Sequence, residues 1–342
     1  MKAKRNEAFP FAAKCVAIGL TLVVLAAAVL YCLQYFQPST YTVYEDDGYY
    51  SETTYYRTEQ AFERAMAELE QKEAEGTVQT RSLNVGGEAQ AQQPRGEFVA
   101  AAVKSVWVYE QTDENGNVFE SRLLTKQEVE QAEEKLQALQ EDEQEIVARG
   151  KIYNKTETLE KLHLTFSVYE ETSDYDNIEY DYVLVGSAYW EQALVWFWES
   201  DKSAEETHFD YVAFTWGGGG ALTQTVYNAY GEYYEDYGEA TMAPCDYQPG
   251  QSIVWQFHEK SGPYGKELEH SVFEVCLDRA EPLQNKKAQC KLTYVHTYNA
   301  YSAVIDIEAG VDKDGLSGAA SVTISSEKDN WDVVIPYDLL EY

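Results

Sequence analysis

The apolar residues of the chain recur with three different spacings, and each spacing predicts a different kind of structure. Residues 15–33 contain no charge over nineteen positions, which is typical of a membrane-spanning helix. Over 58–75 and again over 125–149 the apolar residues fall at helical spacing. From residue 150 onward apolar and polar residues alternate, as they do along 162–168, and this period of two predicts strands with one buried face.

The two predicted helices carry signals at their ends as well as along their length. Gly76 follows the first helix at the position where a left-handed residue often closes a helix. Thr125 and Glu128 form a capping box at the start of the second. The second helix has one apolar and one Glu-rich face, so we expect it to dock on a sheet or against the first helix. The apolar faces consist of Phe62, Ala65, Met66 and Leu69 in the first helix and of Val129, Ala132, Leu136, Leu139 and Ile146 in the second.

The fold class follows from the many short strands and the glycine-bearing turns between them. Asn115 and Gly116 form a two-residue hairpin turn, so 98–149 is predicted to hold one β-hairpin followed by the second helix. We expect a mainly β protein with an antiparallel β-sandwich or jelly-roll-like domain over 150–342, in which 217–244 is a long surface loop. Strands are predicted over 162–168, 182–185, 193–198, 209–216, 253–258, 268–277, 292–298, 303–307, 320–325 and 331–335.

The N-terminal part is predicted to be an anchor and a spacer. Residues 1–14 carry four basic residues and one acidic residue, which favours a cytoplasmic tail. Residues 15–36 then form a signal anchor that crosses the cell membrane once and leaves the rest of the chain outside. The alternative is a signal peptide cleaved after Ala28, which would leave an apolar new N-terminus. Residues 37–97 are interpreted as an extracellular stalk that holds the first helix and a polar linker over 77–97.

The charge of the chain excludes one class of partner and leaves one ion open. The 342 residues contain 26 Lys and Arg against 59 Asp and Glu, a net charge of −33. Nucleic acid would be repelled by this surface, because phosphate contacts require Lys and Arg. Acidic turns that end at Gly48, Gly116 and Gly315 lack the Glu that a calcium-binding EF-hand needs six residues later. We therefore predict no cofactor, and a calcium site between loops stays open without a position in the sequence.

Cysteine and histidine residues supply two further hypotheses. Cys276 and Cys290 lie fourteen residues apart in strand-like segments and are the best candidates for a disulfide in an exported protein, with buried reduced thiols as the alternative. A hairpin formed by the two strands on either side of 261–265 would bring His258 and His270 together. One register lets the two imidazoles share a metal ion, and the other leaves a plain charge pair, which we favour.

The strand pattern resembles that of a known group of exported proteins. The resemblance rests on residues 209–217, 294–298 and 321–325 and on Trp331. These segments are similar to strands of uncharacterised β-rich proteins that Gram-positive bacteria secrete or anchor in the membrane. The resemblance implies an extracellular location and a β-rich fold, and it implies no functional residue.

A binding function is favoured over an enzymatic one because no catalytic motif stands out. The glycine run 217–220 lacks the Lys and the Ser or Thr of a phosphate-binding loop, and neither a nucleophile elbow nor a zinc-protease motif occurs. We predict a membrane-anchored extracellular binding or envelope-associated structural module for a glycan or protein ligand. The alternative is an exported hydrolase with paired carboxylates. Exposed aromatic rings stack on sugars or contact proteins. The candidate ligand contacts are Trp190, Trp216, Tyr230, Tyr233 and Tyr234.

Overall fold

The computed structural model divides the chain into two compact units, Met1–Ser39 and Thr40–Tyr342, and every helix and strand named below belongs to the second. The predicted tail 1–14 and the predicted anchor 15–36 lie outside the described residues. Within the described ranges, no helix is long and apolar enough to cross a membrane. The structure describes residues 39–46, 48–74, 95–112, 118–141, 157–173, 179–194, 209–216, 222–233, 239–241, 244–248, 251–257, 260–261, 266–279, 288–298, 304–308, 321–325 and 330–339.

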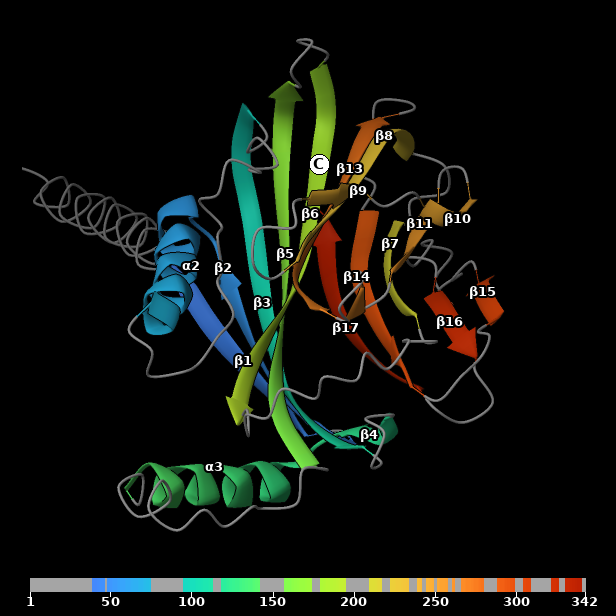
Figure 1. Ribbon diagram of the computed structural model, residues 1–342. Helices are drawn as coiled ribbons and strands as arrows, with labels where there is room; N and C mark the ends of the chain where they lie inside the picture. Colours follow the sequence, from blue (N-terminus) through green and yellow to red (C-terminus); the bar gives the residue numbers. More distant parts are fainter. Residues whose placement is uncertain are drawn as a thin grey trace, which may run out of the picture. The chain divides into compact units, whose positions relative to one another are not determined.

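The described residues are mainly β, and two antiparallel sheets hold most of the strands (Figure 1). The larger, called the first sheet here, has the strand order β1-β2-β3-β5-β6-β13-β8-β9, with β4 beside β3 and β12 beside β13. Its strands are β1 (Thr40–Asp46), β2 (Tyr50–Tyr56), β3 (Arg95–Thr112), β4 (Val118–Leu123), β5 (Glu157–Ser173), β6 (Glu179–Leu194), β8 (Leu222–Tyr233), β9 (Glu239–Thr241), β12 (Lys260–Ser261) and β13 (Lys266–Arg279).

The second sheet has the strand order β10-β11-β7-β14-β17, and a separate two-stranded ladder joins β15 and β16. The predicted strands over 209–216, 292–298 and 331–335 are confirmed here as β7, β14 and β17. The strands of this sheet and of the ladder are β7 (Asp210–Trp216), β10 (Pro244–Gln248), β11 (Ser252–Phe257), β14 (Ala288–Thr297), β15 (Val304–Glu308), β16 (Ser321–Ser325) and β17 (Asn330–Leu339).

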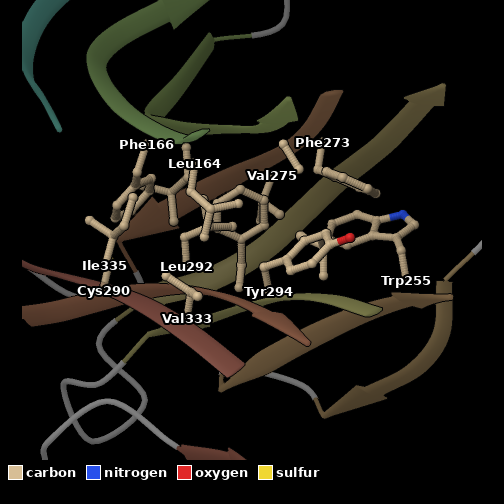
Figure 2. Packing of buried hydrophobic residues seen from close by; sticks show 14 of the residues in the cluster. Leu164, Phe166, Trp255, Phe273, Val275, Cys290, Leu292, Tyr294, Val333 and Ile335 are labelled. Carbon is tan, nitrogen blue, oxygen red and sulfur yellow. The ribbon is translucent and has the colours of Figure 1, made fainter. Parts of the chain in front are cut away.

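The two sheets share one hydrophobic core, built from alternate side chains of both. Figure 2 shows Leu164 and Phe166 of β5 directed toward Leu292 and Ile335 of the second sheet. The rings of Phe166 and Phe214 lie 5.8 Å apart across this core. The alternation predicted along 162–168 therefore places its apolar residues in the core, as expected. Each fully buried aliphatic or aromatic side chain contributes about 1.5–3 kcal/mol to folding.

The sheets approach each other closely where β6 has no side chain. A Cβ on Gly186 would lie 2.8 Å from Cζ of Phe214 and 2.9 Å from Cδ1 of Leu292. Both of those side chains come from the second sheet and are fully buried. Glycine is needed at this position because of the approach and not because of an unusual backbone angle.

The two accessory helices are confirmed, as α2 (Glu59–Ala74) and α3 (Lys126–Glu141). On α2, Phe62 packs against Tyr56 of β2 and Phe98 of β3, with ring centroids 5.6 and 6.0 Å apart. The capping box of α3 is also confirmed, because the backbone N–H and the hydroxyl of Thr125 donate to the Glu128 carboxylate. Both helices pack on the face of the first sheet that points away from the second sheet.

The prediction of a stalk over 37–97 is wrong for its first part. Strands β1 and β2 form a hairpin, and β2 pairs with β3 from Ser51↔Val106 to Tyr56↔Ala101. These strands contain few aliphatic residues, so their alternation is not visible as an apolar pattern. Their place in the sheet depends on a pairing with residues some fifty positions later, which local spacing does not reveal. The linker over 77–97 lies almost wholly outside the described residues.

The predicted surface loop over 217–244 is also wrong, because β8 and β9 occupy much of it. Strand β8 pairs with β13 along eleven positions, from Leu268↔Tyr233 to Arg279↔Leu222. The segment is rich in tyrosine, a residue that is common in strands. Its many polar neighbours conceal that preference when the sequence is scanned for apolar alternation.

The hairpin predicted between 253–258 and 268–277 does not form. Strand β11 pairs with β7 and β10 in the second sheet, whereas β13 pairs with β6 and β8 in the first. The short strand β12 makes the turn into β13 instead, with Lys260 opposite Glu267. The chain therefore changes sheets between β11 and β12, and the rings of Trp255 and Phe273 meet across the core at 5.4 Å.

The predicted disulfide is not formed, because Cys276 and Cys290 are both buried free thiols. On β13, Val275 and Leu277 enter the shared core, so Cys276 between them points to the opposite face of the sheet and packs against Tyr180. Cys290 lies inside the shared core. A strand places neighbouring side chains on opposite faces, and this separates the two sulfur atoms by the sheet itself.

The close approach at Gly186 generates the first testable prediction. Gly186→Ala should lower the free energy of unfolding by about 1–3 kcal/mol, because the added methyl group overpacks the core. Urea unfolding of the full chain measures this change. The matched control repeats the substitution in a Phe214→Leu background, where the contacting ring is absent and the cost of Gly186→Ala should be smaller. An equal cost in both backgrounds would contradict the assigned contact.

Candidate functional site

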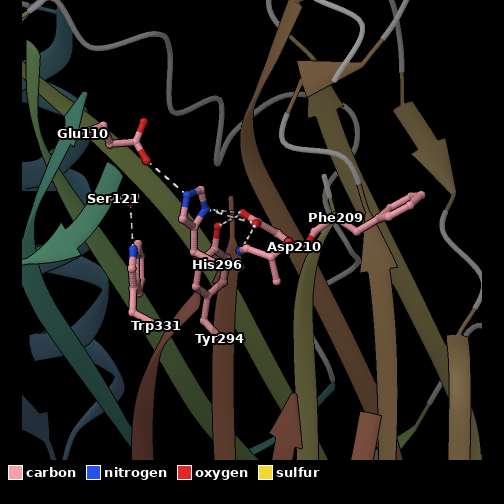
Figure 3. A network of polar contacts seen from close by, with 8 residues as sticks. Glu110, Ser121, Phe209, Asp210, Tyr294, His296 and Trp331 are labelled. Carbon is pink, nitrogen blue, oxygen red and sulfur yellow. Dashed lines mark hydrogen bonds and ion pairs between the residues drawn. The ribbon is translucent and has the colours of Figure 1, made fainter. Parts of the chain in front are cut away.

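A connected group of polar side chains lies between the two sheets (Figure 3). Glu110 comes from β3 of the first sheet, Asp210 from β7 of the second, and Tyr294 and His296 from β14. Each occupies the face of its strand that enters the shared core, as Val108 does two residues before Glu110. The alternation that buries the apolar residues therefore buries these polar groups as well.

The imidazole of His296 contacts one carboxylate from each sheet. Its Nε2 lies 3.1 Å from Oε1 of Glu110, and its Nδ1 lies 3.1 Å from Oδ1 of Asp210. Asp210 also accepts hydrogen bonds from the Tyr294 hydroxyl and from the backbone N–H of Thr297. Nδ1 makes a hydrogen bond with the Asp210 carboxylate, whereas the contact of Nε2 with Glu110 is a close approach that becomes an ion pair when the ring is protonated.

Aromatic rings enclose this histidine. The ring of Trp331 stacks on that of His296 at 4.9 Å, and Trp190 meets it edge-on at 5.9 Å. The Trp331 indole N–H donates to Ser121 of β4 at 2.8 Å, which links the two sheets a second time. The side chains of His296 and Asp210 are only 4% and 2% exposed. In this arrangement the group joins the sheets and is not open to a substrate.

A different feature, the hairpin β1–β2, presents aromatic residues at the surface. Tyr41 is 41% exposed and Tyr44 is 61% exposed, and Val43 between them is 38% exposed. The ring of Tyr41 stacks on that of Tyr55 at 4.9 Å, and the ring of Tyr44 lies parallel to that of Tyr50 at 6.3 Å. Because neighbouring side chains alternate, these two stacks lie on opposite faces of the hairpin.

One ion pair ties the hairpin to the body of the first sheet. Lys104 of β3 is buried, and its Nζ lies 2.9 Å from Oε2 of Glu45 on β1. The hydrogen bond and the charge of Lys104 lower the pKa of Glu45 below its usual value, against the opposing effect of burial. Since β2 lies between β1 and β3, the contact reaches across one strand and holds β1 against the sheet.

Carboxylates surround the Tyr44–Tyr50 stack. Glu52 lies directly opposite Tyr44 in the pairing of β1 with β2. Tyr50 packs against the apolar face of α3, beside which the exposed Glu130 and Glu133 lie. Burial raises the pKa of the Tyr50 hydroxyl, and the negative charges of Glu52, Glu133 and Glu130 raise it further. We call these five residues, Tyr44, Tyr50, Glu52, Glu130 and Glu133, the acidic tyrosine patch.

The aromatic ligand contacts predicted from the sequence differ in where the structure places them. Trp216 is 1% exposed and lies in the shared core, so it cannot stack on a ligand at the surface. Trp190 is half-buried and packs against the same core. Tyr230 and Tyr233 lie on β8, where they pair with Val272 and Leu268, and their role as contacts stays a prediction. Tyr234 lies outside the described residues.

The structure tests the metal hypotheses only in part. His258 lies outside the described residues, and His270 pairs with Tyr189 of β6 in the first sheet. Because β11 and β13 belong to different sheets, the strand pairing that would have joined the two histidines is absent. Within the described ranges, no group of three His, Cys, Asp or Glu residues is arranged to hold a metal ion. Calcium binding in the loops stays a prediction.

Sequence reasoning missed both the buried histidine group and the exposed hairpin. A signal for the first was present, since Asp210 and His296 each stand inside an otherwise apolar run, and buried polar groups require partners. The identity of those partners was not visible, because Glu110 is a hundred residues from Asp210. The tyrosines of the hairpin gave no such signal, because their spacing over 41–56 follows no clear period.

Comparison with known proteins adds little to this description. Neither a protein-family model nor a curated protein sequence matches the chain. A solved structure described as "AvmM Catalyzes Macrocyclization in Alchivemycin A Biosynthesis" is 12% identical, with a TM-score of 0.18. The match covers 44% of this chain and 79% of that chain. A likeness at this TM-score carries no argument about the fold or the function of this chain.

The histidine group generates the second prediction. Asp210→Ala should lower the free energy of unfolding of the full chain by about 3–5 kcal/mol, because it leaves a buried imidazole, a hydroxyl and an N–H without their acceptor. Asp210→Asn keeps one acceptor oxygen and should cost less. The matched control is Asp246→Ala on β10, a half-buried aspartate, which should cost at most about 1 kcal/mol. Urea unfolding measures all three, and equal costs for Asp210→Ala and the control would contradict the structural role.

Proposed function

We propose that this chain is a membrane-anchored extracellular binding module with a β-sandwich body, and that the hairpin β1–β2 is its binding surface. The observation that carries the proposal is the distribution of exposed apolar side chains. Of the five large apolar side chains that are exposed among the described residues, three lie on the seven residues of β1: Tyr41, Val43 and Tyr44. Single exposed apolar side chains are ordinary on protein surfaces. Three of them on one strand therefore favour a role of this strand in binding a ligand.

The chemistry of the hairpin suits a binding role. A tyrosine ring offers a flat apolar face and a polar hydroxyl, so it contacts sugar rings, aliphatic side chains and cations. The parallel stacks of Tyr41 with Tyr55 and of Tyr44 with Tyr50 reduce the freedom of the rings before a ligand arrives. Less side-chain entropy is then lost on binding. A cell-surface glycan or a protein is therefore the class of ligand that we propose.

The alternative function, an exported hydrolase, receives less support. A glycosidase needs two carboxylates that face a substrate from opposite sides. Glu110 and Asp210 do face each other, but the His296 ring lies between them and contacts both. Asp210 is buried and already accepts hydrogen bonds from Tyr294 and Thr297. The two carboxylates are therefore occupied by contacts within the core and do not face a substrate.

Topology is the third prediction. The uncharged segment 15–36, with basic residues before it and acidic residues after it, favours a body outside the membrane. Protease added to intact protoplasts that produce the full chain should digest residues 100–342 and leave a cytoplasmic marker protein intact. Protection of the body until the protoplasts are lysed would contradict the extracellular location. Release of the body into the medium with a new N-terminus near residue 29 would show cleavage in place of anchoring.

Binding is the fourth prediction. The full chain in lipid nanodiscs is titrated with soluble polysaccharides, peptidoglycan fragments, and unstructured polypeptides of either charge. At least one of these probes should bind, and Tyr41→Ser with Tyr44→Ser should weaken it about tenfold by removing the rings that contact it.

The matched control for this titration is Tyr247→Ser, since Tyr247 is 48% exposed but lies on β10 in the second sheet. The control should bind like the unchanged chain. An equal loss in the control and in the hairpin variant, or no binding of any probe by the unchanged chain, would overturn the assignment of the hairpin as the binding surface. Far-ultraviolet circular dichroism of each variant checks that the sheets are retained.

A further inference from the structure

Within the described part of the chain, the position of β1 in the first sheet leaves one of its edges available. β1 is the terminal strand of the order β1-β2-β3, and among the described strands it pairs with β2 alone. Six of its seven residues are exposed. An edge strand carries a row of backbone N–H and C=O groups that do not point to the neighbouring strand. This row is a template on which another extended segment can add by backbone hydrogen bonds.

Several means by which proteins protect such an edge are absent from β1. Its sequence, TYTVYED, contains no proline and no lysine, and its first five residues carry no charge. The pairing with β2 proceeds from Thr40↔Tyr56 to Asp46↔Tyr50 without a bulge. Proline, lysine and bulges on edge strands normally prevent edge-to-edge association. A strand that keeps a regular, exposed edge is therefore suited to pair with a partner.

Charge selects the chemistry of that partner. The acidic tyrosine patch lies on one face of the hairpin, and its three carboxylates come from Glu52 of β2 and from Glu130 and Glu133 of α3. The whole chain carries a net charge of −33. A segment that bears lysine or arginine is attracted by this field, whereas an acidic segment is repelled. The same field opposes the pairing of β1 with β1 of a second copy.

Two cationic side chains of the chain already lie over tyrosine rings of this hairpin. The guanidinium of Arg57 lies over the ring of Tyr41, 5.3 Å from its centroid, on the other face of the hairpin. The ammonium of Lys104 lies 5.7 Å from the centroid of the Tyr49 ring. A cation within about 6 Å of an aromatic centroid is attracted by the ring's electron density. Tyr44, the most exposed ring of the hairpin, offers the same chemistry to a cation from outside.

We propose that β1 binds an extended, lysine- or arginine-bearing polypeptide segment, which adds to the first sheet as a further strand and places basic side chains against the acidic tyrosine patch. The proposal rests on the proposed function and names its partner class. Backbone pairing along β1 supplies the position of the segment, and the carboxylates and rings supply the preference for positive charge. Alternate side chains of the segment would face Tyr44 and the patch, and the others would face Tyr41 and Val43.

The fifth prediction uses three synthetic twelve-residue peptides as probes. One alternates Lys with Thr and Val, the second has Glu at each Lys position, and the third is the Lys peptide with N-methyl groups on every backbone nitrogen, so that neither edge can donate. The full chain is held in nanodiscs of zwitterionic lipid, and empty nanodiscs report binding to lipid. The Lys peptide should bind, the Glu peptide should not, and methylation should weaken binding about tenfold because the strand cannot pair. Raising the salt from about 50 to about 500 mM should weaken binding several-fold.

Amide hydrogen exchange separates strand addition from simple charge attraction. Saturating Lys peptide should slow exchange at amides of β1 and leave β10, the edge strand of the second sheet, unchanged. The triple variant Glu52→Gln, Glu130→Gln and Glu133→Gln should weaken binding about tenfold, since it removes the charge of the patch. The matched control removes the same charge from exposed residues elsewhere: Glu59→Gln, Glu63→Gln and Glu97→Gln.

Four results would overturn the proposal. The first is equal weakening by the patch variant and its control, because the attraction would then belong to the whole surface. The second is Lys-peptide binding without slower exchange on β1. The third is a dimer of the chain joined through β1, seen by mass photometry of the nanodiscs. Binding of a polysaccharide at Tyr41 and Tyr44 with no binding of the Lys peptide would also overturn it, while leaving the proposed binding function in place.

Discussion

The burial of alternate side chains from both sheets in one shared core is the interaction on which the rest of this structure depends. β5 and β6 supply one side of it and β7, β14 and β17 the other. The sheets come so close that Gly186 leaves no room for a methyl group beneath Phe214. The first sheet thereby becomes a rigid support, and its far face is free to hold α2 and α3. The hairpin β1–β2 extends from this support, which gives its tyrosines fixed positions.

A polar group inside such a core must replace the hydrogen bonds to water that it loses on burial. His296 does so with a carboxylate from each sheet, and Trp331 does so with the Ser121 hydroxyl. The contacts of His296 with Glu110 and of Trp331 with Ser121 cross from one sheet to the other, so they oppose sliding of the sheets as well as their separation. Apolar contacts alone resist separation but tolerate small shifts. We infer that these two contacts help to specify how the sheets are aligned, since directed polar contacts tolerate less displacement than apolar ones.

The acidic surface and the exposed hairpin belong together in this interpretation. A strongly charged chain repels its own copies, which permits an open edge strand that would otherwise promote aggregation. The same charge attracts a basic partner and orients it before contact. Lys104 shows that a positive group is tolerated beside the hairpin when it contacts Glu45, although its side chain is buried. The edge can then remain available to a partner without exposing the protein to self-association.

The sequence by itself determined those features that depend on neighbouring residues. Alternation along 162–168 and 292–298, helical spacing over 58–75, and the capping box at Thr125 all predicted elements that the structure contains. Backbone geometry sets these periods, so they are visible in any window of a dozen residues. The mainly β class and the two helices followed from them.

Only the tertiary structure decided which strands become neighbours. It placed β11 and β13 in different sheets, gave β1 and β2 to the first sheet, and turned Cys276 away from Cys290. The contact of Glu110 with His296 and the exposure of Tyr44 depend on the same choice. Each strand could satisfy its backbone with several partners. The choice among them is made by the fit of side chains from segments far apart in the sequence, which no local pattern records.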